Sequence, residues 1–240
     1  MRHNWSWKAA TKCFAVGLLV FGLTVGLAPV VGAIPITALD GTWQDPVGGA
    51  NVQIDNAAVP RTIRWGFPPP ANTSGYNWTP AGTPFDAPSN GTPFILGTFN
   101  HLNFVIPDGS AITKVDLAFS MTIDALTPTQ DLIHFTHDET PNVFTPLSNP
   151  LNDDLVTVSS PLMNTPFNFE GTAYVFSLLG FSKDGGNTIV TQFSTQEGQE
   201  NIADLYGAIS AAPIPEPATM LLLGSGLIGL AGFARKKFKR

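Results

Sequence analysis

Residues 134–139 bring two histidines and two carboxylates together: His134, His137, Asp138 and Glu139. A further histidine, His101, could join them from another strand. His134 and His137 are an odd number of residues apart, so on one strand their imidazoles face opposite sides and cannot bind the same ion. The pattern therefore does not predict a zinc site, and a strand that ends in a polar turn explains these residues better.

Calcium fits the same segment better than zinc. Asp138, Glu139 and Asn142 would supply three oxygen ligands across a turn that contains proline, and hard cations take six to eight oxygens. A second group of oxygen donors follows: Asn152, Asp153 and Asp154. The sequence has no Asp-x-Asp-x-Asp-Gly loop, so the alternative is that these side chains cap turns. Calcium is the only cofactor that the sequence suggests.

Aromatic residues suggest a second kind of site. Tyr76 and Trp78 lie in a stretch rich in Pro, Gly and Asn, where exposed rings could contact glycans. Trp43 and Trp65 are expected to fill the core, which is the commoner role of Trp in a β-sandwich.

We expect no catalytic residues. The exported part of the sequence lacks a G-x-S-x-G elbow, an HExxH pair and a phosphate-binding glycine loop. A glycoside hydrolase would need two carboxylates about 5–9.5 Å apart, and seventeen acidic residues allow such a pair by chance. A polysaccharide hydrolase is therefore kept only as a minor alternative.

The elements that would position these residues are short strands. In residues 115–123, large apolar residues alternate with small or polar ones, which predicts a half-buried strand, and residues 132–136 form its expected antiparallel neighbour. Residues 68–93 are interpreted as a long surface excursion, and residues 197–209 as one short helix. The pattern lacks a βαβ rhythm and predicts an all-β fold, a sandwich or jelly roll.

The N-terminal 33 residues are typical of a secretory signal peptide. A basic start is followed by an apolar stretch and by small residues before the predicted cleavage between Ala33 and Ile34. We therefore expect the Sec translocon and signal peptidase to act on the chain. Cys13 is the single cysteine, so the mature domain, residues 34–212, can contain neither a disulfide nor a cysteine nucleophile.

The last 28 residues, 213–240, have a different composition. Pro215, Glu216 and Pro217 precede an apolar stretch at 218–234, which as a helix would be about 26 Å long and would just span a membrane. The basic tail at 235–240 should stay in the cytoplasm, with the domain before it on the other side of the inner membrane.

Net charge separates the domain from its ends. The full chain has a net charge of −6, whereas residues 34–214 have four basic and seventeen acidic residues, a net charge of −13. Such an acidic domain offers no surface for phosphates, which excludes nucleic acid as a partner. An acidic extracellular domain can stay soluble by repulsion or recruit divalent cations.

The C-terminal segment resembles the PEP-CTERM sorting signal: a Pro-Glu-Pro motif, one apolar span and a terminal basic cluster. The resemblance implies that exosortase, a membrane-embedded transpeptidase or protease of Gram-negative bacteria that make exopolysaccharide, recognises the chain. It implies cleavage near Pro215–Pro217.

Residues 40–210 resemble the choice-of-anchor K domain, a surface domain without an assigned activity. The elements that carry this resemblance are Gly41-Thr42-Trp43, Ile63-Arg64-Trp65-Gly66, residues 94–104, His137-Asp138-Glu139-Thr140-Pro141-Asn142, Gly180-Phe181 and residues 193–197. Asn100 departs from the Thr expected before His-x-Asn.

These features together predict a non-enzymatic exported protein of the cell envelope or extracellular matrix. It would reach the periplasm, cell surface or matrix through a membrane-anchored precursor and play a structural or adhesive role with exopolysaccharide. The alternative is a carbohydrate-binding module.

Overall fold

The computed structural model describes residues 32–67, 73–124, 129–160, 165–212 and 224–228. Residues 1–31 of the predicted signal peptide lie outside these ranges, and so do the whole Pro215-Glu216-Pro217 motif and the whole basic tail. Residues 224–228 form a short helix. Within the described ranges, no helix has the length and apolar character that crossing a membrane requires.

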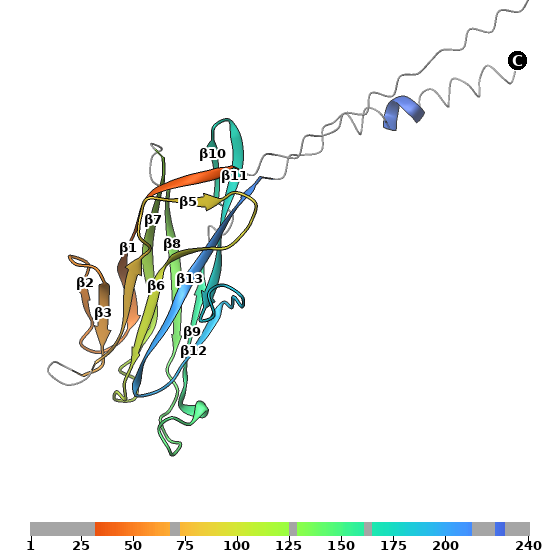
Figure 1. The fold of residues 1–240 in the computed structure, drawn as a ribbon. Helices are drawn as coiled ribbons and strands as arrows, with labels where there is room; N and C mark the ends of the chain where they lie inside the picture. The colour runs from red at the N-terminus through yellow and green to blue at the C-terminus, as the bar shows by residue number, and fades with distance from the viewer. Residues whose placement is uncertain (1–31, 68–72, 125–128, 161–164, 213–223, 229–240) are drawn as a thin grey trace, which may run out of the picture. The chain divides into compact units, whose positions relative to one another are not determined.

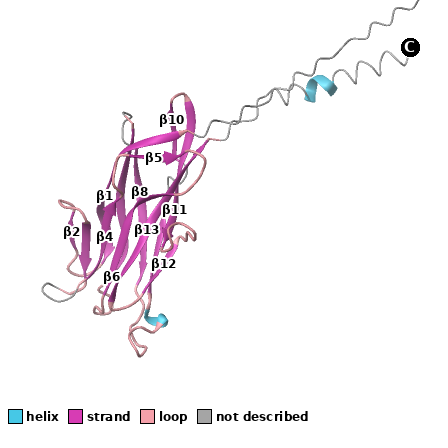
Figure 2. Ribbon diagram, viewed as in Figure 1, coloured by secondary structure: helices cyan, strands magenta, loops and turns pink. Residues whose placement is uncertain are grey.

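Two antiparallel sheets face each other and confirm the all-β prediction (Figures 1 and 2). The six-stranded sheet has the order β12 (Gln192–Thr195), β9 (Asp154–Ser159), β8 (Thr129–Asp138), β7 (Ile112–Ile123), β1 (Ala33–Gly48) and β5 (Phe85–Pro88). The seven-stranded sheet has the order β10 (Thr165–Phe169), β11 (Thr172–Ser182), β13 (Gln199–Ala211), β6 (Phe94–Asn103), β4 (Ser74–Pro80), β3 (Arg61–Trp65) and β2 (Gln53–Asp55).

The strongest strand prediction is confirmed. β7 covers the alternating stretch, and Val115, Leu117, Phe119, Met121 and Ile123 are all buried. β8 pairs with β7 in antiparallel register. Period-two burial on a sheet that packs on one face explains this agreement.

The core between the sheets is largely aromatic. Trp43 of β1 contacts Tyr76 of β4 with ring centroids 5.7 Å apart, and Phe99 of β6 stacks on Phe135 of β8 at 5.2 Å. Trp43 and Trp65 are buried, as the sequence predicts. These contacts join one sheet to the other, since the paired rings come from opposite sheets.

The helix predicted at 197–209 is wrong, because this segment contains strand β13. The spacing of its apolar residues fits a helix as well as a strand. Ile202, which the helix would have buried, is 57% exposed, whereas Ala203, Leu205 and Ile209 are buried. β13 lies between β6 and β11, and the ladders on both sides fix it as a strand. Tertiary pairing therefore overrides the three- and four-residue spacing.

The surface excursion predicted at 68–93 is also corrected. It contains β4 and β5, and in β4 the inward residues Ser74, Tyr76 and Trp78 are all 0% exposed. Gly75, Pro80 and Pro88 lie within the paired strands themselves, and such residues make a strand hard to recognise from its sequence.

The chain enters and leaves the sandwich at one end, the terminal end, where β1 begins and β13 finishes. Ala33 pairs with Pro88, and two residues further Asn90 bridges to Ser210. β1 runs from there to the opposite end of the sandwich, and β13 runs back from the opposite end to the terminal end. At the opposite end β6, β8 and β12 finish and β9 and β13 begin, and the loop with the 3-10 helix η1 (Pro150–Asn152) extends from it (Figures 1 and 2). We call this opposite end the polar end.

Gly97 of β6 permits the close approach of β4. A Cβ on Gly97 would lie 2.5 Å from the Thr79 carbonyl oxygen and 2.5 Å from the Trp78 indole. A Cβ on Gly82, in contrast, would meet nothing within 4 Å.

We expect Gly97→Ala to lower the free energy of unfolding by about 1–3 kcal/mol, because neither backbone nor buried indole can move freely. Gly82→Ala should change it by less than about 0.5 kcal/mol. Urea unfolding followed by tryptophan fluorescence measures both. Equal stability of the two variants would contradict the packing described here.

Candidate metal centre

At the polar end of the sandwich, beyond the aromatic core, polar side chains from both sheets lie close together. Glu139 follows β8, Asp154 begins β9, and Glu197 lies in the turn between β12 and β13. Potential ligand atoms of these three carboxylates all lie within 4.8 Å of one another. Asp154 is 0% exposed and Glu197 is 2% exposed.

Strand register explains why these distant residues meet. Asp138 pairs with Leu155, Thr195 pairs with Asp154, and Gln199 pairs with Asn103. In each pair, the end of one strand therefore lies beside the beginning of its partner strand. Each pairing brings its neighbouring acidic residue to the polar end.

Two imidazoles form the inner wall of the cluster. His101 of β6 is 0% exposed and His137 of β8 is buried, and both lie within 4.8 Å of Asp154 when ligand atoms are compared. The His137 and Tyr76 rings meet edge to face at 5.9 Å. His134, as expected from its odd spacing, faces the other side of the sheet and pairs with Asp116 at 2.6 Å.

The hydrogen bonds assign the tautomer of His101. Thr195 Oγ1 donates its proton to the Asp154 main-chain oxygen at 3.2 Å, so it must accept from His101 Nδ1 at 2.9 Å. Burial, with a smaller contribution from His137, holds the pKa of His101 well below its usual value. The neutral ring therefore points an Nε2 lone pair inward, and that atom has no hydrogen-bond partner among the described residues.

His137 adopts the other tautomer. The Tyr76 hydroxyl donates to His137 Nδ1 at 2.7 Å, and His137 Nε2 donates to Glu139 Oε2 at 3.2 Å. When Glu139 and Asp154 are ionised, the opposite arrangement would turn a lone pair toward two negative charges, since Asp154 Oδ2 is only 3.8 Å from the same nitrogen. Burial lowers the pKa of His137 despite the attraction of Asp154. Both nitrogens of His137 are thus already engaged.

The three carboxylates have unusual acidity. Burial raises the pKa of Glu139 to about 7. Burial and then the charge of Glu139 raise the pKa of both Asp154 and Glu197 to about 7. Crowded carboxylates removed from water resist ionisation unless a positive charge lies between them. The cluster can therefore hold protons or a cation.

The structure brings together only part of the predicted calcium group. Glu139 belongs to the cluster, and Asn142 lies beside Glu197 with a buried Oδ1 that has no described partner. Asp138 is exposed and points away. From the second group, Asp154 joins the cluster and Asn152 instead holds the loop through bonds with Phe144.

Sequence reasoning missed Glu197 and Asn103 as members of the site, whereas His101 does join His137 from another strand. Glu197 was placed at the start of a helix, which hid its position in a turn. Asn103 is 0% exposed, donates to the Thr195 carbonyl oxygen at 3.1 Å, and leaves Oδ1 without a described partner. The alternation of side chains along a strand places His101 and Asn103 on the same face of β6, and both are buried.

The glycan prediction for Tyr76 and Trp78 needs correction. Both side chains are 0% exposed and lie in β4 rather than in a loop, so neither ring offers a face to a sugar. At the predicted signal cleavage site, Ala33 is the first residue of β1. Ile34 pairs with Ala87 of β5 in the same sheet, and its side chain is buried.

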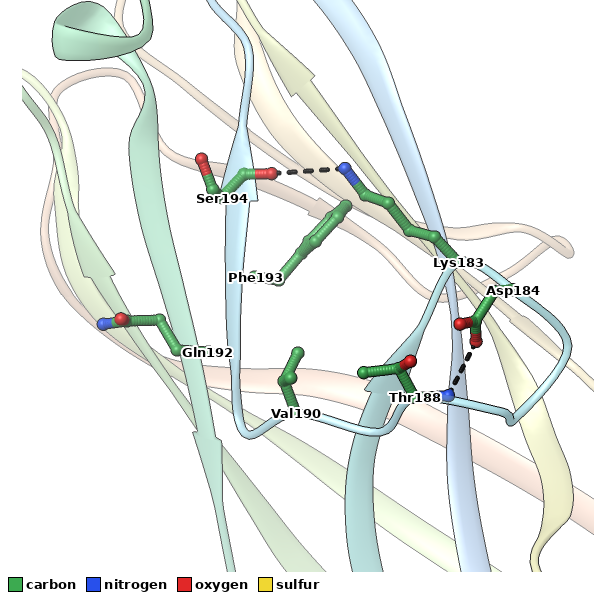
Figure 3. A pocket seen from close by; sticks show the side chains of 7 residues that line it. All are labelled: Lys183, Asp184, Thr188, Val190, Gln192, Phe193 and Ser194. Carbon is green, nitrogen blue, oxygen red and sulfur yellow. Dashed lines mark hydrogen bonds between the residues drawn. The ribbon is translucent and has the colours of Figure 1, made fainter.

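Two surface pockets lie away from the cluster. One, of about 280 Å³, is lined by residues between Lys183 and Ser194, and Figure 3 shows Lys183 reaching over the Phe193 ring toward the Ser194 carbonyl. The other, of about 440 Å³, includes Phe85, Phe94 and Tyr206.

A comparison with protein families matches residues 213–236 to the PEP-CTERM protein-sorting motif. No curated protein matches the chain. The motif indicates an exported protein that exosortase sorts through its C-terminal signal. The match lies outside the β-sandwich, so the resemblance of residues 40–210 to the choice-of-anchor K domain stays a prediction.

The raised carboxylate pKa values predict a pH-dependent stability in the presence of chelator. A pKa above its unfolded value stabilises the fold at low pH, and this contribution disappears as pH rises through about 7. The two buried histidines act oppositely, but only below about pH 6.5, where the unfolded chain binds protons. The melting temperature in EDTA should therefore fall between pH 6.5 and 8.

Calorimetry of the full chain in mild detergent tests this prediction. Glu197→Gln should make the fall shallower, whereas Glu170→Gln, which removes an exposed carboxylate, should leave it unchanged. A melting temperature that stays constant over this pH range would show that the carboxylates are not crowded as described.

Proposed function

We propose that this chain is a non-enzymatic surface protein of a Gram-negative bacterium, cleaved by exosortase and retained as structural or adhesive material of the envelope or extracellular matrix. The observation that carries the proposal is the position of the sorting motif. It begins at residue 213, directly after Ala212, which donates a hydrogen bond to Ala173 at the end of the sandwich.

The proposed route begins with the signal peptide. The Sec translocon would export the chain, and signal peptidase would cleave between Ala33 and Ile34 before β1 docks against β5. The apolar stretch at 218–234 would hold the precursor in the inner membrane with the basic tail in the cytoplasm. Exosortase would then cleave near Pro215–Pro217, outside every strand of the sandwich.

The non-enzymatic part of the proposal rests on where the chemistry-bearing groups lie. Of the most perturbed acids and histidines, His101, His137, Asp154 and Glu197 are buried and Glu139 is half-buried. An enzyme that acts on a polymer needs its acid and base beside an open cleft. The described pockets instead lie on other surfaces.

Association with exopolysaccharide through a carbohydrate-binding surface is the second candidate. The pocket beside Phe85, Phe94 and Tyr206 favours it, because it combines aromatic edges with a volume in the range of small-ligand sites. Exposed Ile95 forms part of its rim.

Sorting is tested by following the size of the protein in cells. Glu216→Ala, or deletion of exosortase, should leave a larger, membrane-bound form because the tail is not removed. Glu170→Ala removes an exposed carboxylate outside residues 213–236 and should be processed normally. Identical mobility on a blot of wild-type, Glu216→Ala and exosortase-deficient cells would disprove the sorting route.

The two candidate roles are separated by binding to purified exopolysaccharide and its oligosaccharides. A structural protein should show no saturable binding to oligosaccharides, although its deletion should weaken the matrix. Saturable binding that Ile95→Asp reduces more than tenfold, and that the exposed substitution Val143→Asp does not change, would favour the carbohydrate-binding role instead.

A further inference from the structure

The polar end contains more buried oxygen acceptors than donors to satisfy them. Among the described residues, six of these oxygens have no hydrogen-bond partner: Asp153 Oδ1, Asp154 Oδ2, Glu197 Oε1 and Oε2, Asn103 Oδ1 and Asn142 Oδ1. A buried acceptor without a partner is costly, and a buried carboxylate is more so. A site with this composition requires positive charge.

Nearby basic side chains do not provide that charge. The domain has only four basic residues besides histidine. Arg61 pairs with Asp40, Arg64 donates to main-chain oxygens of β3 and β4 and to Asn77, Lys114 pairs with Asp116, and Lys183 reaches Ser194. The two buried histidines are neutral, so three carboxylates meet without a cationic side chain beside them.

The donor atoms favour an oxygen-binding cation over a zinc-like ion. The alternative set is His101, His137 and Asp154, which also converges within 4.8 Å. In that set, however, His137 already uses both nitrogens, with Tyr76 and with Glu139. Only the single Nε2 of His101 remains as a nitrogen ligand, against the six unpartnered oxygens. Hard divalent cations such as Ca²⁺ take carboxylate and amide oxygens.

The geometry points to a structural binding site for one divalent cation of the Ca²⁺ class, coordinated by the carboxylates of Glu139, Asp154 and Glu197. The Asn142 side chain lies beside Glu197 at the edge of this set. Asn103 is held close by its main-chain oxygen, which accepts from Gly198 N at 2.8 Å. This site is independent of the sorting route and of the proposed surface role.

A cation here would join three separate segments of the chain. Its ligands come from the end of β8, the start of β9 and the turn between β12 and β13. Asp154 Oδ1 already accepts from Thr140 N at 2.8 Å and so orients its other oxygen toward the cluster. The cation would therefore fix the loop of residues 139–153 to the sandwich.

The test measures the unfolding midpoint of the full chain in mild detergent, after removal of metals and with Ca²⁺ or Zn²⁺ added. At about a hundredfold excess over its dissociation constant, Ca²⁺ should raise the midpoint by roughly 5–10 °C. Elemental analysis after dialysis should find about one Ca²⁺ per chain, as expected for one closed site.

Glu197→Gln gives the sharper readout because its effect should change sign. Without metal, the variant should melt at a higher temperature than the wild type, since one buried charge is removed. With Ca²⁺ it should melt lower, because a ligand is lost. Asp138→Asn, which changes the exposed carboxylate next to Glu139, should respond to Ca²⁺ as the wild type does.

Three results would overturn the inference. If Ca²⁺ neither raises the midpoint nor remains bound after dialysis, the cluster is not a cation site. If Zn²⁺ alone raises the midpoint and His101→Gln abolishes that effect, the imidazole set binds the metal and the oxygen-ligated assignment is wrong. A Glu197→Gln variant that is less stable under both conditions would likewise contradict the site.

Discussion

Tyr76 connects the apolar core with the polar end, and the arrangement of the domain depends on this connection. Its ring contacts Trp43, Trp65, Phe99 and Phe135, while its hydroxyl donates to His137. One side chain thus fixes the separation of the sheets and the tautomer of an imidazole. Because aromatic packing is close and rigid, the His137 ring is held in place beside Glu139 and Asp154.

The carboxylates of Glu139, Asp154 and Glu197 repel one another at the polar end. An acidic surface normally spreads its charges in water, where screening makes each contribution small. Glu139, Asp154 and Glu197 are instead brought together by the ends of paired strands and are withdrawn from solvent. The domain therefore concentrates part of its negative charge at one buried point rather than over its surface.

The sequence predicted regular strands well and the site only in part. Alternation in β7 gave a correct strand because one face packs and the other does not. β13 was misread because its middle is buried on both faces, which erases the alternation. Glu139 and Asn142 were identified as oxygen donors from their own turn. Asp154 was found only as a member of a separate group, His101 only as a residue that could join from another strand, and Glu197 was missed, because only strand register reveals that the three turns meet.

The placement of the chain ends also has a mechanical consequence. The chain leaves the sandwich at the end of β13, which lies in the interior of its sheet between β6 and β11. If the C-terminal side holds the domain while its polar end is attached elsewhere, tension runs along β13. The hydrogen bonds to both neighbouring strands then bear the load together in shear, and the strand cannot be peeled away one bond at a time. A tether at an edge strand such as β12 or β2 would lack this resistance.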